Sequence, residues 1–295
     1  MKLLRLTKQN VLKSFVSLGF ISCVLITFGI CFSSEIALEN NETSITVFNI
    51  IMGKNDVLFD DFHYAFEAVL MNGSGSWLMM FLPIIVSLVY VPLFCDERES
   101  RMTRYVIGKV GKLSYNWGNF IANFLVSGLA VMLGYALFMI TCGFFFPPIS
   151  AYPEDQQAIF KNMLENDLIY RNLGLVAWEI SQFLCIFVYS AMWSLPAFGM
   201  SAVIRNKYLL TCIPFFVKYI LDQGTQKLMF DAMQDWMNID VKKFDFIQII
   251  STNSLRSIFN SGHVMWKIAV LQGAILIVFL VSHNLLMNRR FDLGD

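Results

Sequence analysis

The stretch Trp77-Leu-Met-Met-Phe-Leu-Pro-Ile-Ile-Val-Ser-Leu-Val-Tyr-Val-Pro-Leu-Phe-Cys95 contains no charged residue. About 20 consecutive apolar residues form a helix long enough to cross the roughly 30 Å of hydrocarbon in a bilayer. The polar segment Asp96-Glu-Arg-Glu-Ser-Arg101 follows immediately. This abrupt change of character predicts a membrane-spanning helix that ends at an aqueous surface.

Five other segments are also strongly apolar. Charged residues make up only 15% of the 295 residues, against about 25% in an ordinary soluble domain, and 56% of the residues are apolar or aromatic. The sequence therefore predicts an all-α polytopic membrane protein with six transmembrane helices, forming one domain over residues 1–295. The expected spans are residues 14–32, 77–95, 117–145, 173–203, 208–222 and 267–287.

The distribution of Lys and Arg predicts the orientation, because cytoplasmic loops carry an excess of these residues. With the N-terminus inside, the inner segments hold thirteen Lys and Arg residues and the outer segments hold seven. We therefore predict a multi-pass protein of the plasma membrane with the N- and C-termini both cytoplasmic.

The outer loops would then be residues 33–76, 146–172 and 222–265. Long loops without structure are uncommon in compact proteins, so we expect short helices in these segments. Apolar residues recur at helical spacing over residues 226–237, which predicts one such helix. It could be an interfacial or gating helix, or a surface helix packed on the bundle.

Catalytic and metal-binding motifs are missing from the sequence. The six cysteines form no CxxC pair and lie in apolar stretches, which favours small buried side chains over a metal site or disulfides. Gly108–Ser114 lacks the spacing of a nucleotide-binding loop, and a net charge of zero gives no sign of nucleic-acid binding. We therefore expect neither an enzyme nor a bound cofactor or metal in this chain.

Residues 96–112 form the most distinctive polar segment. Read as a helix, they place Glu97 and Arg101 four residues apart in the favourable order, and Met102, Tyr105, Val106 and Lys109 on one face. A short cytoplasmic helix of this kind could dock into a groove of another protein, or touch lipid headgroups as a basic juxtamembrane segment. The candidate contact residues are Glu97, Arg98, Arg101, Met102, Arg104 and Tyr105.

The pattern Phe94-x2-Glu97-x3-Arg101-x2-Arg104-Tyr105 after the second span resembles the membrane subunits of type-2 ABC exporters, the ABC-2 permease family. Ser100 and Met102 stand where that family commonly has a glycine. The resemblance implies that residues 96–112 are a coupling helix seated in a separate ABC ATP-binding subunit, which holds ATP and Mg²⁺. It also implies a second permease chain, as a homo- or heterodimer, and an N-terminal elbow helix over residues 1–13 at the inner leaflet.

The function implied by this resemblance is export of a hydrophobic or amphipathic substrate, such as a peptide, a lipid-linked molecule or a drug. An intramembrane protease of the Glu-Glu-xxx-Arg kind is an alternative, although Glu97-Arg-Glu-Ser-Arg101 lacks the adjacent glutamates. A sensor or immunity protein that acts by binding alone is another alternative.

Two charges, Glu179 and Lys218, fall inside the expected spans. Each would cost roughly 2.5–3.5 kcal/mol near the centre of a bilayer. They could form a structural ion pair between antiparallel neighbours, or they could line the path of a substrate.

Overall fold

The computed structural model describes residues 2–39, 43–53, 61–73, 76–100, 102–165, 167–234 and 265–292. This part of the chain is almost entirely helical, and it contains one two-stranded hairpin. The elements in chain order are α1 (Lys2–Phe15), α2 (Leu18–Phe32), β1 (Glu35–Glu39), β2 (Thr43–Thr46), α3 (Val47–Ile51), η1 (Phe62–Tyr64), α4 (Phe66–Gly73), α5 (Ser76–Glu99), α6 (Met102–Val110), α7 (Lys112–Phe145), η2 (Ile149–Ala151), α8 (Glu154–Leu164), α9 (Leu168–Met200), α10 (Lys207–Gln234) and α12 (Met265–Asp292).

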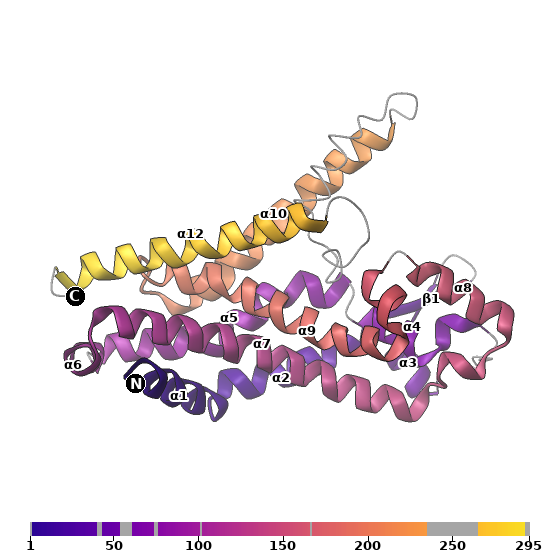
Figure 1. The fold of residues 1–295 in the computed structure, drawn as a ribbon, viewed down its shortest axis with the longest axis horizontal. Coiled ribbons are helices and arrows are strands. Elements are labelled where there is room, and N and C mark those ends of the chain that lie inside the picture. The colour runs from indigo at the N-terminus through magenta and orange to yellow at the C-terminus, as the bar shows by residue number, and fades with distance from the viewer. Residues whose placement is uncertain are drawn as a thin grey trace.

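The long helices form an elongated bundle. Helix α7 packs against α2 and α9, and α5 packs against α2, α9 and α10. In Figure 1, α1, α6 and the C-terminal end of α12 lie at one end of the bundle, whereas β1, α3, α4 and α8 lie at the other end. We refer to these as the α6 end and the α8 end. Because both chain termini lie near the α6 end, the chain runs the length of the bundle an even number of times.

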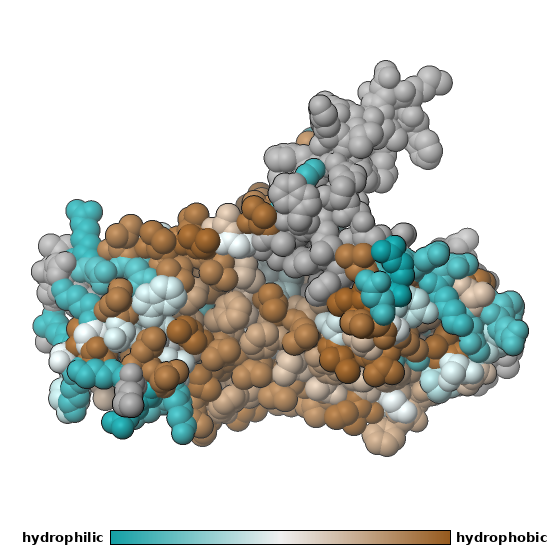
Figure 2. All heavy atoms as spheres, in the orientation of Figure 1, coloured by the Kyte–Doolittle hydropathy of each residue, from teal (hydrophilic) through white to brown (hydrophobic). Residues whose placement is uncertain are grey.

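A broad apolar zone covers the middle of the face of the bundle that Figure 2 shows. Hydrophobic residues dominate the visible face between two ends that are richer in hydrophilic residues (Figure 2). Three helices, α5, α7 and α9, are long and apolar enough to cross a membrane, and α1 with α2 would give a fourth crossing if that bent pair is one span. The described parts of α10 and α12 do not meet both conditions of length and apolarity. The structure is therefore that of a helical membrane protein with three or four spans by these criteria.

Helix α7 ends where the sequence predicts. Its 34 residues reach about 51 Å at 1.5 Å per residue, and it stops at Phe145, before Pro147 and Pro148. It begins at Lys112, five residues earlier than expected, directly after Gly111. Gly111 has a φ of 89°, a left-handed conformation that separates α6 from α7 at little cost to a glycine.

The first predicted span, residues 14–32, is not one straight helix. Helices α1 and α2 meet at an angle of 60° around Val16 and Ser17. The Ser17 hydroxyl accepts a hydrogen bond from the Phe20 N–H at 3.2 Å and so begins α2 with an N-cap. Residues 2–15 thus form a separate helix, over nearly the same residues as the expected elbow helix.

The segments predicted to be outer loops contain more than the expected short helices. Strands β1 (Glu35–Glu39) and β2 (Thr43–Thr46) pair antiparallel, and Ile36 and Ile45 are buried. The helix expected over 226–237 is also different. Its residues up to Gln234 continue α10 as one helix of 28 residues, and residues 235–237 lie outside the described part of the chain.

The cysteines are free, as the sequence indicates. Five of the six are buried and Cys212 is half-buried. Cys23, Cys31, Cys142 and Cys185 belong to the main apolar core between α2, α5, α7 and α9, where they fill space as small hydrophobic side chains.

Candidate functional site

Helix α6 exposes large apolar side chains at one end of the molecule. Met102 and Tyr105 are 57% and 65% exposed, and Lys109 Nζ lies 4.1 Å above the centre of the Tyr105 ring. The opposite face of α6 packs on the bundle through Thr103 and its apolar neighbours. The sequence pattern places Val106 on the same face as Met102 and Tyr105, and the structure corrects this. Val106 is half-buried and packs inward, because α6 contacts α5 and α7.

The arginines of the predicted coupling segment differ in position. Arg98 lies at the end of α5, where its guanidinium donates a hydrogen bond to the Ser201 carbonyl at the C-terminus of α9. A cation is favoured there by the partial negative charge of a helix C-terminus. Arg104 is exposed on α6, and Arg101 lies outside the described residues. Arg98 therefore connects two long helices within the bundle.

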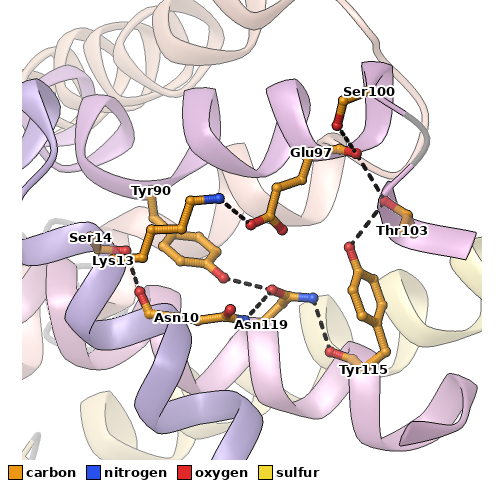
Figure 3. Close-up of polar contacts among 9 residues, drawn as sticks. All are labelled: Asn10, Lys13, Ser14, Tyr90, Glu97, Ser100, Thr103, Tyr115 and Asn119. Carbon is orange, nitrogen blue, oxygen red and sulfur yellow. Dashed lines mark hydrogen bonds and ion pairs between the residues drawn. The ribbon is translucent and has the colours of Figure 1, made fainter. Parts of the chain in front are cut away.

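Glu97 joins α5 to α1. Lys13 Nζ lies 2.7 Å from Glu97 Oε1, and the two side chains are 51% and 20% exposed. The Glu97 carbonyl also accepts hydrogen bonds from Ser100 Oγ at 3.0 Å and from Thr103 Oγ1 at 3.3 Å (Figure 3). The carboxylate and carbonyl of one residue thus contact α1 and the beginning of α6.

Asn119 on α7 is the centre of a buried network of hydrogen bonds. Its Oδ1 accepts from Asn10 Nδ2 at 2.8 Å and from the Tyr90 hydroxyl at 2.6 Å, and its Nδ2 donates to the Tyr115 carbonyl at 3.0 Å (Figure 3). Asn10, Tyr90, Tyr115 and Asn119 are all buried. We call Asn10, Lys13, Tyr90, Glu97 and Asn119 the inner network, because they tie α1, α5 and α7 together at the α6 end.

Further polar contacts connect α6 and α10 to this end of the bundle. The Thr103 hydroxyl lies 3.4 Å from the Tyr115 hydroxyl, and Lys2 Nζ donates to the Lys109 carbonyl at 3.1 Å. Lys207 at the start of α10 lies 2.8 Å from Asp96 Oδ1, and this hydrogen bond and charge raise the pKa of the Lys207 ammonium. A displacement of α6 would therefore act on α1 and α7 directly.

The two charges in the predicted spans do not pair with each other. Lys218 Nζ lies 2.6 Å from Asp222 Oδ2, one turn further along α10, and 5.4 Å from the centre of the Trp193 ring on α9. Lys218 is almost fully buried, at 3% side-chain exposure. Glu179 lies on α9 and is half-buried, and none of the ion pairs among the described residues includes it. The expected ion pair between Glu179 and Lys218 is thus replaced by one within α10.

The inner network was missed by sequence reasoning. The sequence pattern that could have predicted it is the spacing of Asn116, Asn119, Asn123 and Ser127 in the uncharged run of α7. This spacing places four polar side chains on one face of a helix. All four are buried. The partners of Asn119, which are Asn10 and Tyr90, are distant in sequence and could not be paired with it from spacing alone.

No group of three or more His, Cys, Asp or Glu side chains that could hold a metal ion occurs within the described residues. Comparison of the chain with protein-family models, with curated proteins and with solved structures found no match. Any account of function therefore depends on the geometry of the α6 end and on the motif in residues 94–105.

Proposed function

We propose that this chain is the transmembrane subunit of an ATP-driven exporter of the ABC-2 kind. In this proposal α10 and α12 join α2, α5, α7 and α9 as six spans in the plasma membrane, with the α6 end and both termini in the cytoplasm. A separate ATP-binding subunit holds ATP and Mg²⁺ and docks on α6. A second permease chain completes the path for a hydrophobic or amphipathic substrate: a peptide, a lipid-linked molecule or a drug.

The exposed face of α6 is the observation that carries the proposal. Met102 and Tyr105 are large apolar side chains, more than half exposed, at a hydrophilic end of the molecule. An apolar helical face of this kind suits a hydrophobic groove in a partner protein. Arg104 and Lys109 on the same helix would favour a groove with an acidic rim.

The contacts around α6 support a conformational role. Hydrogen bonds link α6 to α7 through Thr103 and to α1 through Lys2, and the inner network links α1 to α5 and α7. In the proposed mechanism, closure of the ATP-binding subunits pushes α6, and these contacts make α1 and the ends of α5 and α7 move with it. In this mechanism the ATP-binding subunits hydrolyse ATP, and the chain described here receives the resulting movement through α6.

The test is purification of the tagged full-length chain from membranes of its native host. We expect an ATP-binding protein to co-purify with the wild type and with Ile159→Ala, because Ile159 is exposed at the α8 end. Tyr105→Ala should lose that protein while it keeps a wild-type melting temperature, since exposed substitutions usually change stability by less than about 0.5 kcal/mol.

Two results would count against the proposal. Retention of the ATP-binding protein by Tyr105→Ala combined with Met102→Ala would exclude α6 as the docking element. Normal complex formation with weaker membrane retention of these variants would instead favour α6 as a segment that touches lipid headgroups.

A further inference from the structure

Helix α1 turns its polar side toward the bundle and apolar side chains outward. The side that packs on α7 is mostly polar, with these buried residues: Leu6, Thr7, Asn10 and Ser14. Leu4 and Leu12 lie on the opposite side of the helix and are 75% and 55% exposed. A helix on the surface of a water-soluble protein has the reverse arrangement, with its apolar stripe toward the core. The outward side of α1 therefore suits an apolar surrounding.

Two cations lie between these leucines on the same side of the helix. At about 3.6 residues per turn, one arc of roughly 100° contains four residues: Leu4, Arg5, Lys8 and Leu12. We call these four residues the outer face of α1. Arg5 and Lys8 are exposed, and neither belongs to an ion pair among the described residues. Residues 1–34 contain no Asp or Glu, so the neighbouring sequence does not neutralise these cations.

The remaining contacts of α1 keep the outer face turned away from the bundle. Asn10 Nδ2 donates to Asn119 Oδ1 at 2.8 Å, and Lys13 Nζ lies 2.7 Å from Glu97 Oε1. Both contacts are made by the side of α1 that faces the bundle. Figure 1 shows α1 at the edge of the bundle, at the α6 end. The outer face is therefore open to whatever surrounds the protein there.

The bend between α1 and α2 extends this apolar surface. Val16 and Leu18 at the bend are 83% and 84% exposed. Helix α2 continues from there as an uncharged helix, and it forms one candidate membrane crossing together with α1. In a bilayer, the outer face of α1 would lie where the chain passes from the headgroup region into the hydrocarbon.

We propose that the outer face of α1 binds anionic phospholipids. Leu4 and Leu12 insert beside the acyl chains, and Arg5 and Lys8 extend their long side chains to the phosphate groups. Helices that combine leucines with Lys and Arg bind at the lipid interface, and attraction to anionic lipids strengthens this binding. The face would bind such lipids whether or not α6 docks on an ATP-binding subunit.

Photo-crosslinking in vesicles of known composition tests the proposal. The full-length protein carries a photoreactive phenylalanine analogue in place of Leu12, in vesicles with equal amounts of phosphatidylglycerol and phosphatidylcholine. Mass spectrometry then counts the adducts of the two lipids at position 12. Because each cation near an anionic surface strengthens binding by roughly fivefold, adducts of phosphatidylglycerol should outnumber those of phosphatidylcholine by roughly fivefold or more.

Two double variants separate the outer face from cations elsewhere in the chain. Arg5→Gln with Lys8→Gln should make the two lipid adducts about equal. Lys161→Gln with Arg171→Gln removes two exposed cations, on α8 and at the start of α9, and should leave the ratio at position 12 unchanged. Monodisperse gel filtration of both double variants establishes that they are folded.

Three results would overturn the proposal. The first is equal adducts of the two lipids in the chain without the glutamine substitutions. The second is an unchanged excess of phosphatidylglycerol in Arg5→Gln with Lys8→Gln. The third is a crosslink from position 12 to a second copy of the protein in place of lipid, because protein would then cover the outer face.

Discussion

Replacement of Asn119 by leucine tests the inner network most specifically. Asn119→Leu removes the oxygen that accepts from Asn10 and Tyr90 and the N–H that donates to the Tyr115 carbonyl. Two buried donors on α1 and α5 would then lose their partner.

The expected loss in the free energy of unfolding follows from the two hydrogen bonds that Asn119 accepts from other helices. Hydrogen bonds between helices in membrane proteins contribute about 0.6 kcal/mol on average and up to about 1.7 kcal/mol. A buried donor left without a partner costs about 1–3 kcal/mol. We therefore expect Asn119→Leu to lower the free energy of unfolding by about 2–4 kcal/mol.

Asn116→Leu is the matched control, because it makes the same chemical change one turn earlier on α7. Asn116 donates one long bond of 3.2 Å to Asn288 Oδ1, and its own buried oxygen has no partner. Removing a buried oxygen that has no hydrogen-bond partner removes its desolvation penalty, and this offsets the loss of the bond to Asn288. The free energy of unfolding should therefore change by less than about 0.5 kcal/mol.

The assay is equilibrium unfolding of the full-length protein in detergent micelles, for the wild type and both variants. A second readout is the distance between spin labels on α1 and α6, which should broaden only in Asn119→Leu. Equal losses of stability in the two variants would refute the assignment of Asn119 as the centre of the network.

Three further outcomes are expected. In intact cells, a membrane-impermeant thiol reagent should label Asp155→Cys on α8 and leave Tyr105→Cys on α6 unlabelled; the reverse pattern would invert the orientation. Lys218→Met should lower the melting temperature, at a cost of about 2–4 kcal/mol for the unpaired Asp222 carboxylate. Lys218→Met with Asp222→Leu should recover most of this loss, and the exchange Glu179→Lys with Lys218→Glu should recover none. Gly19→Ala should cost about 1–3 kcal/mol in thermal unfolding, because the new methyl group meets the Leu88 carbonyl oxygen of α5, whereas Gly29→Ala on the same helix meets nothing within 4 Å.

Charge patterning predicted the parts of the fold that depend on length and polarity. Helix α5 carries the uncharged run 77–95 and ends just beyond it, and α7 ends before Pro147. The bend at Ser17 was not predictable, because serine is tolerated inside apolar helices and its cap to Phe20 exists only once the helices separate. The strand pair β1 and β2 was not predicted, because strands of five and four residues carry too short an alternation to stand out within a loop of 44 residues.

The candidate site was likewise predictable only where it depends on the local sequence pattern. The exposed face of α6 was predicted in part, since Met102 and Tyr105 lie outward while Val106 packs inward. The partner of Lys218 differs from the predicted Glu179, because Asp222 lies one helical turn away on the same helix and reaches the ammonium group without any contact between helices. Contacts of Asn119 with Asn10 and Tyr90 arise from tertiary packing, and spacing along the chain carries no information about them.

The most direct measurement of the central claim is site-specific photo-crosslinking at Tyr105. A photoreactive phenylalanine analogue replaces Tyr105 in the full-length chain in its native membrane, and the same analogue at Ile159 is the control at the α8 end. If α6 docks on an ATP-binding subunit, position 105 should crosslink to an ATP-binding protein, identified by mass spectrometry, in a way that ATP alters, and position 159 should not. Crosslinks from position 105 to lipid alone, or equal crosslinks from both positions, would contradict this docking.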